Sequence, residues 1–319
     1  MRGLNLFKPA FFMVLFYVFT SSAGLTAERH IVSNGRDFDR KQTLVIGKVS
    51  EDPEKHYKTL KPIADYAVER MDDLGIRQAK VLFAKDNAMM ISYLRQGKVD
   101  WITETPFSAI TFMKKGKVEI LLRRWKKGVF EYHTVFFTRK DSKIISLEDL
   151  KGKTIAFEDP GSTSAFLIPA ATLIQKGLNL VQLATPREKP PADMIGYVFA
   201  INEVNVPTWV FRNLVDAGAF SNLDWDDDDR MIESQKAEIR IFHRTNSIPR
   251  GFELVRQDLD PEIKKRLKQI LLNSHLDPSA KEVLKAYKKT TRFDELDDTA
   301  SNRLEWIESL SEIIHAELM

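Results

Sequence analysis

Short apolar segments alternate with longer amphipathic segments along most of the chain. Residues 43–49 read TLVIGKV, a β-branched run bounded by polar residues, and this pattern is typical of a buried strand. Pro53 follows at a position where a helix can begin, and apolar side chains then recur at helical spacing from Leu60 to Met71. The first unit of the fold is therefore predicted to be a strand followed by a helix.

The same alternation continues in two series. In the first series, strands are predicted at residues 79–84, 99–103 and 118–122, and helices are predicted to begin at Asp86 and Pro106. In the second series, the predicted strands are residues 133–138, 153–157, 197–201 and 215–220, and the predicted helices are residues 164–175 and 206–214. Strands that alternate with helices of this length indicate βαβ units, so we expect a mainly parallel sheet in each series.

Two short segments indicate that the two series are related. LRQGKVDW at residues 94–101 and FRNLVDAG at residues 211–218 both run from a helix end into Val-Asp and a strand. We therefore predict an α/β fold of two similar lobes, each a mainly parallel sheet flanked by helices. The elements expected to complete the first lobe are strands at 238–243 and 251–256 and helices at 261–274, 278–288 and 299–317.

The lobe boundaries follow from this order of elements. Lobe one is predicted to comprise residues 28–137 plus 241–319, and lobe two residues 138–240. The chain would cross between the lobes twice, near residues 134–140 and 238–250. Two short crossings of this kind can act as a hinge, because a few residues absorb the backbone rotation of a closing motion.

The first 27 residues differ from the rest of the chain. Arg2 and Lys8 precede an apolar run at residues 10–19, which passes into small residues up to Ala27. This layout predicts a secretory signal peptide, residues 1–27, and a periplasmic mature protein, although a cut after Ala23 or Gly24 competes. The alternative is an uncleaved anchor, but the apolar run is shorter than the roughly 20 residues of a spanning helix.

Composition narrows the possible functions. The chain has 319 residues, enough for two lobes, and its formal net charge of +3 gives no support to nucleic-acid binding. With no cysteine, disulfides, a lipid-modified cysteine and thiolate metal sites are excluded. The six histidines lack metal-binding spacing, and the acidic run at residues 226–229 lacks the spacing of a calcium loop. We therefore expect no metal, no cofactor and, since the usual catalytic motifs are absent, no catalytic residue.

The most informative segment is residues 146–169, SLEDLKGKTIAFEDPGSTSAFLIP. A predicted strand ends near Glu158, and Ser162, Thr163 and Ser164 then stand in the first turn of a helix. A helix start offers unpaired backbone N–H groups and the positive end of the helix dipole, so it can bind a small anion together with nearby hydroxyls. The alternative is that one of these residues only caps the helix.

The same segment resembles a known family. The order D-L-K-G-K, strand, D-P-G-S-T-S and L-I-P is similar to phosphate, phosphite and phosphonate-binding proteins of bacterial ABC importers. Lys98-Val-Asp100, residues 135–142 and Val215-Asp-Ala-Gly-Ala219 are similar to that family as well, in consistent order. The resemblance extends from about Thr43 to Ala286. It implies a type II periplasmic-binding fold.

The resemblance also implies roles for individual residues. Ser162, Thr163 and Ser164 correspond to the hydroxyl triplet that holds the anion, and Tyr57 is similar to a tyrosine that reaches it from the other lobe. The remaining candidates are Thr105 and Phe107, in a turn where the family has Gly-Pro-x-x-Tyr, and Glu203 and Asp216, which correspond to family contacts for a ligand amine. Thr105 and Ala109 depart from the family turn. Glu203 could equally be a solvated loop residue and Asp216 a turn cap.

The function implied is the capture of a small oxyanion for a membrane permease, by a protein expected to be a monomer. The alternative is a sensory module of similar fold that signals to a membrane kinase or receptor, and an enzyme is the third possibility. A basic cluster of Arg123, Arg124, Lys126 and Lys127 around Trp125 is expected to be either a solvated hairpin face or a partner surface.

Overall fold

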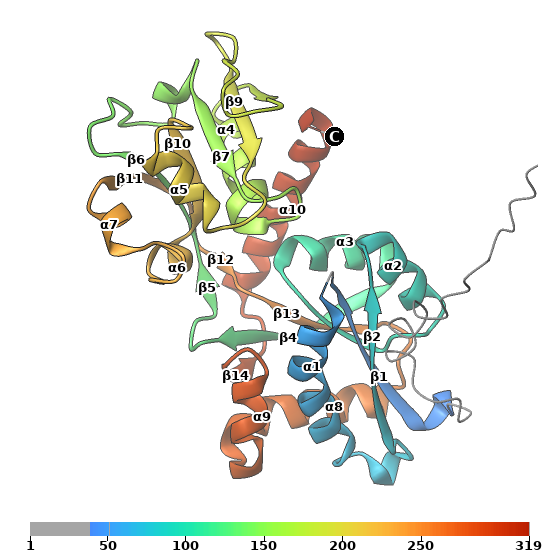
Figure 1. Ribbon diagram of the computed structural model, residues 1–319. Helices are drawn as coiled ribbons and strands as arrows, with labels where there is room; N and C mark the ends of the chain where they lie inside the picture. Colours follow the sequence, from blue (N-terminus) through green and yellow to red (C-terminus); the bar gives the residue numbers. More distant parts are fainter. Residues whose placement is uncertain (1–38, 51, 319) are drawn as a thin grey trace, which may run out of the picture. The chain divides into compact units, whose positions relative to one another are not determined.

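Two six-stranded sheets form the framework of the described residues. The computed structural model describes residues 39–50 and 52–318. The first sheet has the strand order β14-β4-β13-β3-β1-β2, and the second has the order β11-β6-β10-β7-β9-β8 (Figure 1). We call each sheet with the helices that cover it a lobe. The predicted α/β fold with two sheet-based lobes is confirmed.

In the first sheet, a parallel part is followed by an antiparallel part. The strands are β1 (Thr43–Val49), β2 (Gln78–Ala84), β3 (Trp101–Glu104), β4 (Val118–Lys126), β13 (Phe252–Arg256) and β14 (Thr290–Asp294). β1 pairs in parallel with both β2 and β3, whereas β13 lies antiparallel between β3 and β4. β13, which comes late in the sequence, is therefore an internal strand of the sheet.

The second sheet has the same plan. Its strands are β6 (Thr134–Arg139), β7 (Thr154–Phe157), β8 (Leu180–Gln182), β9 (Ile195–Phe199), β10 (Ala217–Ser221) and β11 (Ile239–Arg244). β7 pairs in parallel with β9 and β10, and β6 lies antiparallel between β10 and β11. Each sheet thus contains one antiparallel strand that follows a crossing between lobes, which the alternation of strands and helices did not reveal.

The repeated Val-Asp motif has one structural role in both lobes. The Asp100 carboxylate accepts a hydrogen bond from the Val45 backbone N–H at 2.9 Å, and the Asp216 carboxylate accepts one from the Thr154 backbone N–H at 2.9 Å. The backbone N–H of each aspartate donates to the carbonyl of the same partner, Val45 or Thr154. Each aspartate therefore satisfies backbone groups at the start of a central strand. The internal similarity is confirmed at this position.

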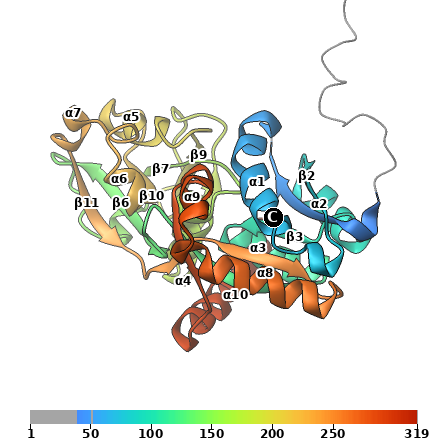
Figure 2. The same cartoon turned by 90° about the horizontal axis from the view of Figure 1, so that it is seen from below.

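Helices cover both faces of each sheet. The longer helices are α1 (Pro53–Val68), α2 (Asn87–Arg95), α3 (Pro106–Gly116), α4 (Ile168–Gln175), α5 (Asn205–Phe211), α8 (Pro261–Asn273), α9 (Lys281–Ala286) and α10 (Asp298–Leu318). α1 and α8 pack together on the face of the first sheet that carries Leu44 and Ile46 (Figure 2). In the second lobe, α4 and α5 belong to separate cores on opposite faces of the sheet.

The first crossing lies just before the predicted residues 134–140, and the second overlaps the predicted residues 238–250. β6 and β11 both belong to the second sheet, so the chain changes sheets before residue 134 and after residue 244. At these crossings β5 (Glu131–Tyr132) pairs with β12 (Ile248–Pro249) in a short antiparallel ribbon. The two connections are therefore hydrogen-bonded to each other beside the cavity described below.

The last helix joins the two lobes, which differs from the prediction that it completes lobe one. α10 packs against α3 of the first lobe and α4 of the second lobe. Its buried residues Ile307, Leu310 and Ile314 share one core with Phe107 and Ile110 of α3 and with the second sheet. An amphipathic sequence indicates that a helix is packed, but it does not indicate how many partners the helix has.

The predicted signal peptide, residues 1–27, lies outside the described residues. Within residues 39–50 and 52–318, no helix has both the length and the apolar composition needed to cross a membrane.

A buried carboxyl group organises the centre of the first sheet. Glu253 of β13 is fully buried, and it accepts hydrogen bonds from the Trp101 indole N–H at 2.7 Å and the Tyr287 hydroxyl at 3.0 Å. Burial raises the pKa of Glu253 to about 7, and the Arg124 charge opposes this rise. The Arg124 Nε lies 3.8 Å from the carboxylate. One acidic group therefore serves several buried donors.

We predict that Glu253→Leu destabilises the protein by about 3–5 kcal/mol, because it leaves Arg124 and three neutral donors, on Trp101, Thr103 and Tyr287, buried without their acceptor. The measurement is equilibrium urea unfolding. Glu119→Leu is the matched control on the adjacent strand, since Glu119 is a half-exposed partner of Lys264 and its loss should cost no more than about 1 kcal/mol. Equal effects of the two substitutions would contradict the role given to Glu253.

Candidate anion-binding site

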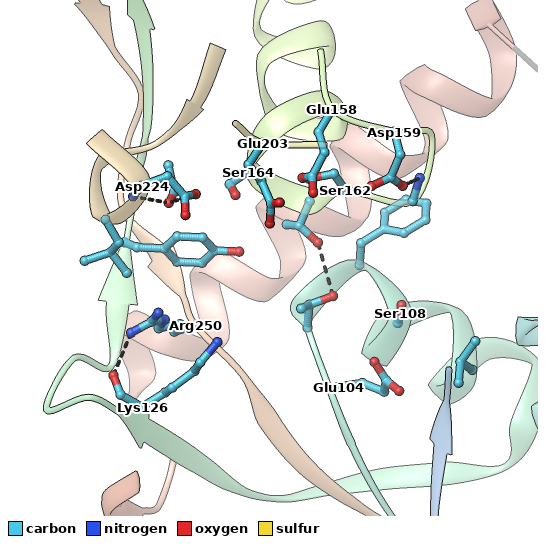
Figure 3. Close-up of a pocket in the computed structure, with 18 of the residues that line it drawn as sticks. Glu104, Ser108, Lys126, Glu158, Asp159, Ser162, Ser164, Glu203, Asp224 and Arg250 are labelled. Carbon is cyan, nitrogen blue, oxygen red and sulfur yellow. Dashed lines mark hydrogen bonds between the residues drawn. The ribbon is translucent and has the colours of Figure 1, made fainter. Parts of the chain in front are cut away.

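One cavity of about 470 Å³ is lined by residues from both lobes (Figure 3). The first lobe contributes the end of β3, the start of α3 and the end of β4, and the second lobe contributes the segment after β7 and the segments around β10. The residues that line the cavity and carry charge or hydroxyl groups are Glu104, Thr105, Ser108, Lys126, Tyr132, Glu158, Asp159, Ser162, Thr163, Ser164, Glu203, Ser221, Asp224 and Arg250.

The predicted hydroxyl triplet lies at the start of a helix and lines this cavity. Ser162 is the N-cap residue of a π-helical turn (Thr163–Leu167) that continues into α4, and its hydroxyl accepts a hydrogen bond from the Ala165 N–H at 3.2 Å. Thr163 and Ser164 are buried. Backbone N–H groups in the first turn of a helix lack acceptors within the helix, so this segment presents both amides and hydroxyls to the cavity.

The start of α3 faces the triplet from the first lobe. Thr105 is the N-cap residue of α3 and makes no side-chain capping bond within it. Instead, the Thr163 hydroxyl donates a hydrogen bond to the Thr105 hydroxyl at 3.3 Å, which joins the two lobes. Phe107, in the first turn of α3, lines the cavity and also packs in the core shared with α10. Two helix starts therefore meet at this cavity.

Five carboxyl groups also line the cavity, and two of them have a cationic partner. The Lys48 ammonium lies 3.3 Å from Glu104, and the Arg230 guanidinium lies 2.9 Å from Glu203. Glu104 therefore has a partner within its own lobe, and so does Glu203. The carboxylate that directly precedes the altered turn at Thr105 is thus compensated by a nearby cation.

A third carboxyl group is neutralised by a proton. Burial and the neighbouring Glu203 raise the pKa of Glu158 to about 8, while the Ser162 hydroxyl opposes the rise. At neutral pH, Glu158 is therefore mainly uncharged beside the hydroxyl triplet. Burial likewise raises the pKa of Asp224, whose carboxylate accepts a hydrogen bond from the Ser221 hydroxyl at 2.5 Å. An anion at the triplet meets much less repulsion than five ionised carboxylates would produce.

Lys126 and Arg250 supply positive charge to the cavity, and sequence reasoning missed both in this role. The Arg250 guanidinium donates to the Lys126 backbone carbonyl at 2.6 Å, which holds the two residues side by side. The expectation of a solvated hairpin face for residues 123–127 is wrong, because Arg123 and Arg124 are buried. The charge pattern was visible in the sequence, but its position at the cavity depends on the return of the chain through residue 250.

Two of the predicted contacts do not line the cavity. Tyr57, in the first turns of α1, is 45% exposed and is absent from the cavity wall. The Asp216 carboxylate accepts the Thr154 N–H, so it serves the strand start described above. The structure therefore brings together Ser162, Thr163, Ser164, Thr105, Phe107 and Glu203, and it leaves Tyr57 and Asp216 outside. Among the described residues, no group of three acidic or histidine side chains could hold a metal ion.

The protein has two α/β lobes, and the chain contributes one antiparallel strand to each lobe after it crosses from the other. Residues of both lobes line one cavity. These features define a type II periplasmic-binding fold, which is the fold of a class of solute-binding proteins. A protein-family model described as "ABC transporter, phosphonate, periplasmic substrate-binding protein" matches residues 49–300. The chain belongs to this family, whose members are the substrate-binding components of ABC importers and not enzymes. A phosphate-import protein, PhnD, from Mycolicibacterium smegmatis is 29% identical over 141 residues, which span 43% of each protein.

Solved structures show the same fold. XAC2383 from Xanthomonas citri, solved with chloride, is 39% identical with a TM-score of 0.82, and the match covers 87% of this chain and 100% of that one. The same protein solved with ATP is 38% identical with a TM-score of 0.81 over the same shares. PhnD1 from Prochlorococcus marinus, in complex with methylphosphonate, is 18% identical with a TM-score of 0.62 over 86% of this chain and 99% of that one. At that identity the likeness shows the fold alone.

The raised pKa of Glu158 predicts that stability falls as pH rises from about 4.5 to about 8. In this range the folded state holds a proton that the unfolded state has lost, so raising the pH favours unfolding. Glu158→Gln keeps the group neutral and should be more stable than the wild type at pH 8, with little difference at pH 4.5. Urea unfolding of both proteins across this range is the measurement, and parallel pH profiles would contradict the assignment.

Proposed function

We propose that this protein captures a small phosphorus oxyanion, phosphate, phosphite or a phosphonate, in the cavity between its lobes and delivers it to the permease of an ABC importer. The mature protein would act as a periplasmic monomer after removal of residues 1–27. The observation that carries this proposal is the placement of Ser162, Thr163 and Ser164 at a helix start that lines the cavity.

Neutral donors at this site can hold an anion without a basic side chain. Each hydrogen bond to a charged group is worth roughly 1.5–3 kcal/mol, and micromolar binding requires about 8 kcal/mol. Four or five donors from the first-turn amides and the three hydroxyls would therefore be sufficient after the cost of association. The neutral Glu158 carboxyl group can add another donor, because a protonated carboxyl group carries an O–H.

The relatives support an anionic ligand. XAC2383, which shares over a third of its residues with this chain, has been solved with chloride and with ATP, and both are anions. PhnD1 has been solved with methylphosphonate. The chain belongs to a family of phosphonate-binding components, and two helix starts face each other across its cavity. Both observations are consistent with a ligand that carries a phosphorus oxyanion.

Closure of the two lobes would complete the site. The hydrogen bond between Thr163 and Thr105 already joins the two lobes at the cavity, so opening of the lobes would break it and closure would form it again beside an anion held by the second lobe. The short β5–β12 ribbon provides the connections about which the lobes rotate. The closed form would then present both lobes to the permease at once.

The proposal predicts that Ser162→Ala combined with Thr163→Ala lowers affinity for the bound oxyanion by about 100-fold or more, since two charge-assisted hydrogen bonds are lost. Calorimetry of the mature protein with phosphate, phosphite, methylphosphonate and ATP first identifies the ligand. The affinity of the double variant for that ligand is then compared with the affinity of the wild type.

Thr172→Ala is the matched control, because Thr172 lies further along α4 and its hydroxyl bonds to the Ile168 carbonyl of the same helix. This control should bind as the wild type does. Circular dichroism shows whether the double variant is folded, since loss of the Ser162 cap alone costs about 1 kcal/mol. Unchanged affinity in a folded double variant would refute the assignment of the triplet.

A further inference from the structure

We propose that Lys126 and Arg250 form a second anion subsite in the cavity, so that the preferred solute is a phosphorus compound with two anionic groups. The first group would occupy the hydroxyl triplet, and the second group, phosphoryl or carboxylate, would bind the two cations. This inference rests on the proposed function, because it assumes that the triplet holds the first anionic group.

The two cations lack acidic partners. Among residues 39–50 and 52–318, no carboxylate lies within 4.0 Å of the Lys126 ammonium or the Arg250 guanidinium, whereas Lys127, the next residue, pairs with Asp227 at 3.4 Å. Arg250 is instead oriented by its bond to the Lys126 carbonyl. Most partly buried cations in this protein have a carboxylate partner, as Lys48 and Arg230 do. The two that line the cavity differ in this respect.

The surroundings of Lys126 contain an excess of positive charge. Burial, together with the charges of Arg250, Arg124 and Lys127, lowers the pKa of Lys126 to about 8, and Asp224 opposes this shift. Behind it, burial and the charges of Lys48, Lys126 and Arg124 lower the pKa of Lys288 to about 6. Both pKa values are lowered because the two ammonium groups are buried and lie close to other cations.

The acidic groups nearby do not balance this charge. Glu104 has Lys48 as its partner, and the buried Glu253 lies beside Arg124, whose Nε and Nη1 still have no hydrogen-bond partner among the described residues. Among the described groups that act most strongly on Lys126 and Arg250, Asp224 is the one carboxyl group, and burial raises its pKa. A bound anionic group would supply the missing negative charge and accept hydrogen bonds from both cations.

The two subsites lie on different walls of one cavity. Figure 3 shows Lys126 and Arg250 on the opposite side from Ser162, Glu158 and Glu203. The cavity of about 470 Å³ lies in the range of pockets that hold organic ligands, roughly 300–1,000 Å³, and a lone phosphate would leave much of it filled by water. A solute with anionic groups at both ends would contact both walls.

The test compares ligands with one and two anionic groups by calorimetry on the mature protein. Methylphosphonate has one such group, pyrophosphate has a second phosphoryl group, and phosphonoacetate has a carboxylate as its second group. The wild type should bind pyrophosphate or phosphonoacetate at least about 10-fold more tightly than methylphosphonate. The tighter of the two identifies the second group as phosphoryl or carboxylate, and either result supports the subsite.

Lys126→Met should reduce this preference by about 10-fold or more, and Lys126→Arg should largely retain it, since the charge is kept. Lys127→Met is the matched neighbour control, because Lys127 lies outside the cavity wall, and it should leave the preference unchanged. A preference that persists in Lys126→Met, or a wild type that binds methylphosphonate but shows no preference, would overturn the second subsite while the proposed function stands. A wild type that binds no oxyanion would overturn both.

Discussion

The proposed binding of an anion in this cavity depends on other groups that neutralise most of the carboxyl groups lining it. Lys48 and Arg230 compensate Glu104 and Glu203, and a proton neutralises Glu158. Without these three compensations, the helix start at Ser162 would face several ionised carboxylates at short range, and its partial positive charge would be outweighed. The pairing of charges around the cavity is therefore as important to the site as the donors within it.

At Ser162, a capping role and the proposed role in ligand binding are compatible. Its hydroxyl accepts the Ala165 N–H as an N-cap does, and the same residue lines the cavity. The cap orients the first turn, and the π-helical turn that follows leaves the neighbouring Thr163 and Ser164 hydroxyls buried at the cavity wall. The local structure thus fixes the positions of the donors before any ligand arrives.

Most of the fold could be predicted from the sequence, because its helices and strands have clear periodicity and end signals. The insertion of the antiparallel strands β6 and β13 between other strands of the two sheets could not be predicted, since strand order depends on long-range pairing. The triplet at residues 162–164 was visible because its parts are adjacent in sequence. Lys126 and Arg250 are separated by more than a hundred residues, so their proximity emerges only when β5 pairs with β12. The sequence also suggested Asp216 as a ligand contact. A carboxylate that contacts a ligand amine and one that accepts the N–H at a strand start are both hydrogen-bond acceptors, so the sequence alone could not distinguish the two roles.

The attachment of α10 to α3 and α4 limits how the two lobes can rotate. The two lobes share a packed helix and a short hydrogen-bonded ribbon, so their rotation axis must pass close to both attachments. Atoms near that axis are displaced least. Arg250 directly follows β12 of the ribbon and holds the Lys126 carbonyl, so we expect this corner of the cavity to keep its geometry if the lobes open as proposed. The ordering cost of the proposed capture would then fall mainly on the distant rim, and the corner would be pre-organised for the first encounter with a solute.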